Sequence, residues 1–341
     1  MTNNDSTDPN TETLAEVQQQ IAGYAKRPGN SITEKTDPMS KLKDPVSLDD
    51  YYALNDRFDF WAVQLAGDNA AYYVSHMPQY MHQHVIMPDG PVADLERAID
   101  PRLGDLTFTK ADGEQTVRLE DFLVGPGRKQ AMMMAHQGKV VFESFPGMNT
   151  NDIHLWMSAG KTTVSTVFTQ LVAEGKVSMD DMSSKHVPAL QGSLWDEIPL
   201  WATATMCVGL DIEETFTSLI TPGSWINNFD NTFLGDYDVP YIEQMKTVKK
   251  LPNGETPGGP GTMRYASGTT LMLQFVCEAI EQKPWGVILQ ERVWSKAGFR
   301  NPAFLCLAPD ATAVGWGMFS TTPEDMLRYA MLYTPSWNTV A

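Results

Sequence analysis

The stretch Trp156-Met-Ser-Ala-Gly-Lys-Thr-Thr-Val-Ser-Thr-Val-Phe-Thr-Gln-Leu-Val-Ala-Glu-Gly175 predicts a buried helix. Its apolar residues recur at i, i+3, i+4, i+7 and i+8, a spacing that places them on one helical face; they are Val164, Val167, Phe168, Leu171 and Val172. Glycine is typical of a helix end, so Gly175 is the expected stop. Ser158 and Lys161 then belong to the first turn, where residues three apart share a face.

This pairing of serine and lysine has a chemical meaning. A serine hydroxyl becomes a nucleophile when a neighbouring base takes its proton, and a lysine amine serves as that base when burial or another cation lowers its pKa. A helix N-terminus adds unpaired N–H groups and positive potential, which favour an oxyanion nearby. We interpret Ser158 as a candidate nucleophile and Lys161 as its base, against the alternative of a capping serine beside a solvated lysine.

Two competing patterns carry less weight. A second Ser-x-x-Lys runs from Ser40 to Lys43, but prolines flank it and no apolar periodicity follows, so it is typical of a loop. Gly160-Lys161-Thr162 resembles the end of a phosphate-binding P-loop, yet that loop needs a glycine at position 155, which is Leu155. A nucleotide site is therefore disfavoured.

Composition restricts the function classes. The 341 residues carry a formal net charge of -17, which argues against nucleic acid or an anionic membrane as partner. No apolar run reaches the length of a membrane span, and the N-terminus lacks the features of a secretory leader. We expect a cytoplasmic protein, or a periplasmic one if the start is incomplete, with reduced cysteines at positions 207, 277 and 306.

The chain divides into three expected parts. Residues 1–46 are polar and predict a flexible arm, 47–130 an extension that packs on the main body, and 131–341 the main domain. The main domain opens with a predicted hairpin over 131–145, whose apolar first strand should be covered by helices. The aromatic and glycine-rich segment 217–262 predicts a substrate-facing flap or a packed surface loop, with Trp225 as a candidate substrate contact.

A metal site is not expected. His76, His82 and His84 lie close in sequence, but no third cysteine or carboxylate is placed to complete a recognisable ligand set. Ordinary hydrogen-bonded or surface histidines are favoured instead.

Several segments together resemble the serine β-lactamase-like hydrolases, closest to class C β-lactamases, related esterases and 6-aminohexanoate-dimer hydrolases. The resemblance covers about 130 to 335 and rests on Ser158-Ala-Gly-Lys161, Glu174-Gly-Lys176, Thr205-Met-Cys-Val-Gly-Leu210, Tyr265-Ala-Ser267 and Gly315-Trp-Gly-Met-Phe-Ser-Thr-Thr-Pro-Glu-Asp325. It implies an α/β fold of the α+β type, with an antiparallel sheet flanked by helices and a helical subdomain over the site.

The resemblance also implies roles for site residues. Tyr265 would relay the proton between Ser158, Lys161 and the leaving group, and Ser267 would hydrogen-bond the lysine or the substrate. The implied reaction is cleavage of a small-molecule ester or linear amide through an acyl-enzyme, ranked above β-lactam turnover, with no cofactor or metal. A catalytically impaired binding protein on the same fold is the alternative, and the oligomeric state stays open.

One family feature is missing from the sequence. These hydrolases carry a third motif, Lys-Thr-Gly or a variant, on a strand that completes the oxyanion hole, and no Lys-Thr-Gly, Lys-Ser-Gly or His-x-Gly follows Tyr265. The resemblance places that motif and the last strands after the final helix, and this chain ends at Ala341. We therefore expect C-terminal strands to be absent. Loss of one oxyanion donor costs about 10²–10³ in rate, so activity of this chain is an open expectation.

Overall fold

The computed structural model describes residues 43, 46–56, 58, 60–64, 69–110, 113, 115–125, 129–252 and 261–341. The predicted flexible arm, residues 1–46, lies almost entirely outside this part of the chain, and so does the serine of the second Ser-x-x-Lys pattern. Within the described residues, none of the helices has the length and apolarity that crossing a membrane requires.

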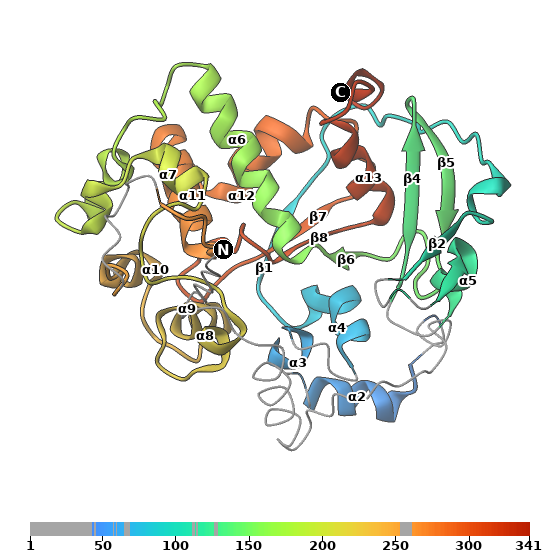
Figure 1. The fold of residues 1–341 in the computed structure, drawn as a ribbon, viewed down its shortest axis with the longest axis horizontal. Helices are drawn as coiled ribbons and strands as arrows, with labels where there is room; N and C mark the ends of the chain where they lie inside the picture. The colour runs from blue at the N-terminus through green and yellow to red at the C-terminus, as the bar shows by residue number, and fades with distance from the viewer. Residues whose placement is uncertain are drawn as a thin grey trace, which may run out of the picture.

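An antiparallel sheet of four strands lies at the centre of the molecule (Figure 1). Its order is β1 (Gln83–Ile86), β7 (Ala303–Cys306), β8 (Phe319–Thr321) and β6 (His154–Leu155). The antiparallel sheet flanked by helices that the sequence predicts is thereby confirmed. Since β1 comes from the predicted extension 47–130, this segment is built into the main sheet, and the division at residues 46 and 130 stays a prediction.

The predicted hairpin is confirmed as β4 (Met132–His136) and β5 (Lys139–Ser144), which pair with each other as a separate two-stranded sheet. Its tight turn holds Gln137 at φ 50 and Gly138 at φ 81. Successive side chains of β4 point to opposite faces. Met132 and Met134 pack toward α5 (Leu119–Val124), whereas Met133 and Ala135 pack toward α13 (Pro323–Met331). Helices therefore cover both faces of this apolar strand.

Two long helices, α6 (Lys161–Ala173) and α11 (Ser267–Glu281), pack against each other and carry the core. The predicted stripe of α6 is buried at Val164, Val167, Phe168 and Leu171, and Gly175 follows the helix end at φ 71. α12 (Trp285–Leu289) packs against β1, and α4 (Ala70–His76) packs against β6. The helices α2 (Leu48–Asp56) and α3 (Phe60–Gln64) precede α4.

A group of short helices lies to the left of the sheet in Figure 1. It comprises α7 (Leu200–Ala204), α8 (Phe216–Ile220), α9 (Trp225–Leu234) and α10 (Tyr241–Gln244). Where it is described, the predicted flap, 217–262, contains most of α8 and all of α9 and α10. Phe229 of α9 and Tyr241 of α10 pack against each other, with ring centroids 4.9 Å apart. β2 (Thr107–Thr109) and β3 (Thr116–Arg118) form a further small pair.

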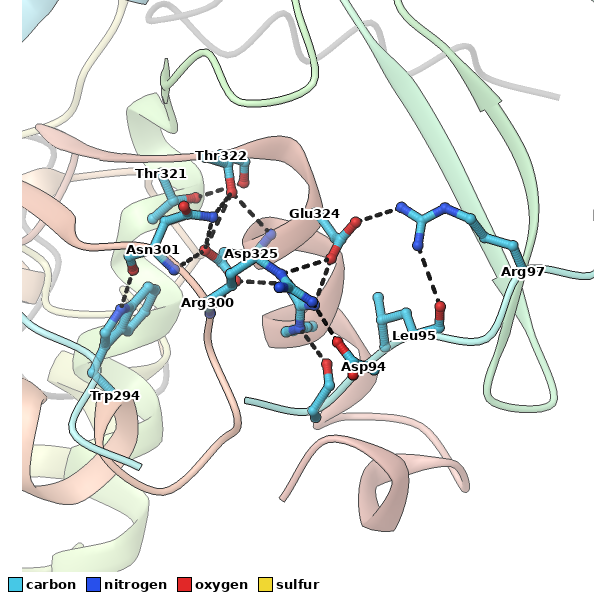
Figure 2. A network of polar contacts seen from close by, with 12 residues as sticks. Asp94, Leu95, Arg97, Trp294, Arg300, Asn301, Thr321, Thr322, Glu324 and Asp325 are labelled. Atoms are coloured by element: carbon cyan, nitrogen blue, oxygen red, sulfur yellow. Dashed lines mark hydrogen bonds and ion pairs between the residues drawn. The ribbon is translucent and has the colours of Figure 1, made fainter. Parts of the chain in front are cut away.

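A polar network fixes the start of α13 (Figure 2). Thr322 caps the helix by accepting a hydrogen bond from the Asp325 N–H. The Asp325 carboxylate also accepts hydrogen bonds from the backbone N–H groups of Arg300 and Asn301, at 2.9 Å each. Fully buried Arg328 completes the network, 2.8 Å from Asp325. A buried charge is tolerated only when it is paired, so this network ties α13 to the loop before β7.

Candidate active site

Ser158 lies where the sheet passes into α6. The preceding Trp156 donates its backbone N–H to the Phe319 carbonyl at 2.7 Å, which fixes this junction on β8. Residues Met157–Gly160 form a 3-10 turn rather than the first turn of the α-helix, which begins only at Lys161. The reason is a sharp change of direction at Met157, whose φ of 50 is uncommon for a bulky residue. Such outliers gather at functional sites.

The Nζ atom of Lys161 donates a hydrogen bond to the Oγ atom of Ser158 at 2.9 Å and another to the Trp316 carbonyl oxygen, also at 2.9 Å. The same Nζ atom lies 4.8 Å from the ring centroid of Tyr265. Lysine, serine and tyrosine, which are far apart in the sequence, are therefore brought together.

These three residues line a cavity of about 240 Å³. Its walls combine polar side chains with apolar ones from α3, α8 and α9. The lining residues are Phe60, Gln64, Met157, Ser158, Lys161, Glu214, Leu219, Asp230, Phe233, Tyr265, Ser267, Trp316, Gly317 and Met318. Ser158 itself is exposed, so its hydroxyl is accessible to a ligand in the cavity.

Tyr265 and Ser267 stand at the start of α11. Ser267 is buried, lines the cavity, and donates its backbone N–H to the Glu214 carboxylate. The Tyr265 ring lies beside Lys161, but its hydroxyl makes no hydrogen bond to Ser158 or Lys161 in the described structure. Tyr265 therefore lies close to Lys161, whereas its role as a proton relay stays a prediction.

Trp225 lies outside this cavity. It is half-buried, stacks on Phe229 with ring centroids 5.0 Å apart, and contacts Gly268 at the start of α11. A Cβ atom on Gly268 would come within 2.7 Å of the Trp225 ring. Its expected contact with substrate remains a prediction.

Two cavity residues were not predicted from the sequence. Glu214 and Asp230 both line the cavity, and Asp230 is buried, with 5% of its surface exposed. Burial raises the pKa of Asp230 well above its ordinary range; the negative charge of Glu214 adds to this, while Lys161 and a hydrogen bond with Gln64 oppose it. A signal for Asp230 exists: an acid interrupts the apolar stripe of α9.

The loop Gly315-Trp-Gly317 forms another wall. A Cβ atom on Gly160 would lie 3.3 Å from the Gly315 carbonyl oxygen, so the nucleophile turn and this loop are in close contact. Another Tyr-x-Ser sequence, Tyr73-Val-Ser75, lies away from the site in α4, where buried Tyr73 donates its hydroxyl to the Leu54 carbonyl oxygen. Within the described residues, no group of three His, Cys, Asp or Glu side chains is arranged to hold a metal ion.

The chain is similar to proteins of a known family. A family model described as Beta-lactamase matches residues 128–339, which is more than half of the chain. The chain belongs to the Beta-lactamase family. The matched residues of this Beta-lactamase family member include Ser158, Lys161 and Tyr265.

The chain is also similar to individual proteins. The chain is 26% identical over 244 residues to the 6-aminohexanoate-dimer hydrolase of Paenarthrobacter ureafaciens; the alignment covers 71% of this chain and 57% of the relative. It therefore spans little more than half the length of this curated relative. A solved Bacillus anthracis structure, provisionally described as a 6-aminohexanoate-dimer hydrolase, superposes with a TM-score of 0.67 at 17% identity, covering 78% of this chain and 69% of that one. At this level of identity, the similarity to the solved structure shows a shared fold only.

Proposed function

We propose that the protein is a serine hydrolase that cleaves an ester or linear amide bond through an acyl-enzyme on Ser158. The observation that carries this is the 2.9 Å contact between Lys161 Nζ and Ser158 Oγ at an accessible cavity. A base at hydrogen-bond distance from a hydroxyl is the geometry that nucleophilic catalysis requires.

Lys161 is proposed as the base. In its neutral form, Lys161 keeps a lone pair for the Ser158 proton while its own N–H donates to the Trp316 carbonyl. Ser158 Oγ then attacks the carbonyl carbon, and the proton passes to the leaving alcohol or amine. Water subsequently attacks the acyl carbon and releases the acid, with Ser158 as leaving group.

Tyr265 is proposed as the relay in these proton transfers. Its ring lies against Lys161, which places the phenol within the same cavity as the nucleophile. Hydrogen bonds at catalytic sites commonly tighten only in the complex, so the hydroxyl is proposed to reach the leaving group once substrate is bound.

The substrate is proposed to carry an amine as well as the scissile bond. Asp230 and Glu214 provide two carboxyl groups in a cavity that also holds the nucleophile. An ammonium group placed between them would be paired with charge and would favour ionised Asp230. The curated relative's name describes a linear amide with an amine, so the same chemistry is the leading candidate here.

A pair of substrates tests the proposal. The p-nitroanilides of 6-aminohexanoic acid and of hexanoic acid differ only in the amine, and hydrolysis is followed for the wild type, Ser158→Ala and Asp230→Asn. We expect no hydrolysis by Ser158→Ala and a preference of the wild type for the amine, which Asp230→Asn reduces. Full activity of Ser158→Ala would reject the mechanism. Equal rates of the wild type on both substrates would reject the proposal that the cavity recognises an amine.

One observation favours a second candidate, a binding protein that acylates without turnover. The Tyr265 hydroxyl is not hydrogen-bonded to Ser158 or Lys161, so the relay is not assembled in the unliganded cavity. Mass analysis of the intact protein after incubation with the nitroanilide separates the two. A persistent acyl adduct on Ser158 with no steady release of product would identify the binding protein.

A further inference from the structure

Behind the cavity, α11 contacts the loop that holds the lysine. Gln274, two turns after Ser267, has no exposed surface, and its Nε2 atom donates a hydrogen bond to the Ala313 carbonyl oxygen at 3.0 Å. Ala313 begins the loop that carries Trp316, the residue whose carbonyl oxygen accepts from Lys161. A single side chain therefore connects α11 to the loop facing the base.

The contact between Gln274 and this loop is close. A Cβ atom on Gly315 would lie 2.6 Å from Gln274 Oε1 and 2.8 Å from Trp285 Nε1, so the loop backbone rests directly on both side chains. On its other side, the Gly315 carbonyl oxygen contacts the nucleophile turn at Gly160. The loop is thus held between α11 and the turn that carries Ser158.

Stability alone does not explain a glutamine here. The Gln274 Oε1 atom is buried and has no hydrogen-bond partner in the described structure. An unpaired buried polar atom is unfavourable, so its presence in a folded protein calls for an explanation. A methionine would fill the same volume without this atom, so the N–H donated to Ala313 is the feature that distinguishes glutamine.

Glu278 lies one turn further along α11 and supports this arrangement. It accepts the Trp285 backbone N–H at 2.8 Å and is hydrogen-bonded to Gln274. Glu278 therefore contacts the Gln274 side chain and the Trp285 backbone, the two residues on which Gly315 rests.

We propose that Gln274 is a positioning residue for the reaction: by holding Ala313, it sets the Trp316 carbonyl at the distance that orients Lys161 toward Ser158. This inference rests on the proposed hydrolase function. It assigns Gln274 no contact with substrate; its effect passes through the loop and the lysine.

Gln274→Met is the variant that tests it. Two quantities are measured: the rate at which a fluorophosphonate labels Ser158, per folded molecule, and the amide hydrogen exchange of a peptide covering 313–318. We expect labelling to slow on the order of tenfold, since misplacing reacting groups by 1 Å costs about 10²-fold. The loop amides should exchange several-fold faster, while the melting temperature changes little.

Controls separate the possible outcomes. Gln170→Met is the matched control, because Gln170 also has a buried, unpaired Oε1 but lies far along α6 from the loop; neither quantity should change. Gln274→Asn, whose shorter side chain cannot reach Ala313, replaces the methionine variant if that one fails to fold.

Two results overturn the inference: unchanged loop exchange in the Gln274 variant, or faster exchange with undiminished labelling. Faster exchange together with slower labelling supports it. If the wild type is not labelled at all, the hydrolase proposal fails, while faster loop exchange in the variant still supports the placement of the loop by Gln274.

Discussion

The Trp316 carbonyl oxygen accepts a hydrogen bond from Lys161 at 2.9 Å, joining residues 155 positions apart in the sequence. This contact explains how the loop before β8 acts on a helix that starts near the middle of the chain. This hydrogen bond fixes one N–H of Lys161. The rest of the amino group then faces Ser158. The site is therefore assembled from the nucleophile turn, α11 and this loop together.

Asp230→Asn should raise stability at neutral pH. Because burial raises the pKa of Asp230, the folded protein binds a proton that the unfolded chain releases above about pH 4. The wild type therefore loses stability as pH rises from there toward the raised pKa, and the asparagine variant does not. Melting temperatures should be close at pH 4 and higher for the variant at pH 8.

The matched control is Asp238→Asn, a substitution on an exposed side chain close to α9. Its melting temperature should stay near that of the wild type at both pH values. A stabilisation by Asp230→Asn that is equal at pH 4 and pH 8 would show that burial of the Asp230 charge is not its cause.

Asp325→Ala should be among the most damaging substitutions. It removes one of the two carboxylates paired with fully buried Arg328, the other being Glu324, and it removes the acceptor of two backbone N–H groups. Breaking a buried pair in this way costs about 3–5 kcal/mol. Urea unfolding measures the loss, with Lys283→Ala, which breaks an exposed pair with Glu291, as the control. Similar midpoints for the two variants would contradict the importance of the network.

Gly268→Ala tests the packing of Trp225. The added methyl group would meet the indole ring at 2.7 Å, and overpacking of this kind costs about 1–3 kcal/mol. Pairing it with Trp225→Phe, which shortens the ring system, should recover part of the lost melting temperature. If the two losses simply add, the tryptophan does not rest on Gly268 in solution.

Much of the fold follows from local sequence patterns. The hairpin at β4 and β5, the buried stripe of α6 and the cap of α13 are predicted by alternation, helical periodicity and the Thr-Pro-Glu-Asp sequence, which are all short-range signals. The pairing of β1 with β7 joins segments more than two hundred residues apart, and no local pattern encodes it.

Some residues of the site can likewise be predicted from local spacing, whereas others are placed only by tertiary packing. Ser158 and Lys161 are three residues apart, so helical geometry alone predicts their contact. Glu214 and Asp230 reach the cavity only through the packing of α9 and the segment before α8, which the sequence does not specify. Acids are usually solvated, so the sequence alone does not indicate a cavity position for Glu214.

The most direct test of the account is peptide mass mapping after fluorophosphonate treatment, on the wild type and on Lys161→Met. We predict a label on Ser158 in the wild type that is lost or strongly reduced in the variant, with both proteins folded by circular dichroism. A folded wild type without a label, or a variant labelled as fast as the wild type, would contradict the claim that Lys161 activates Ser158.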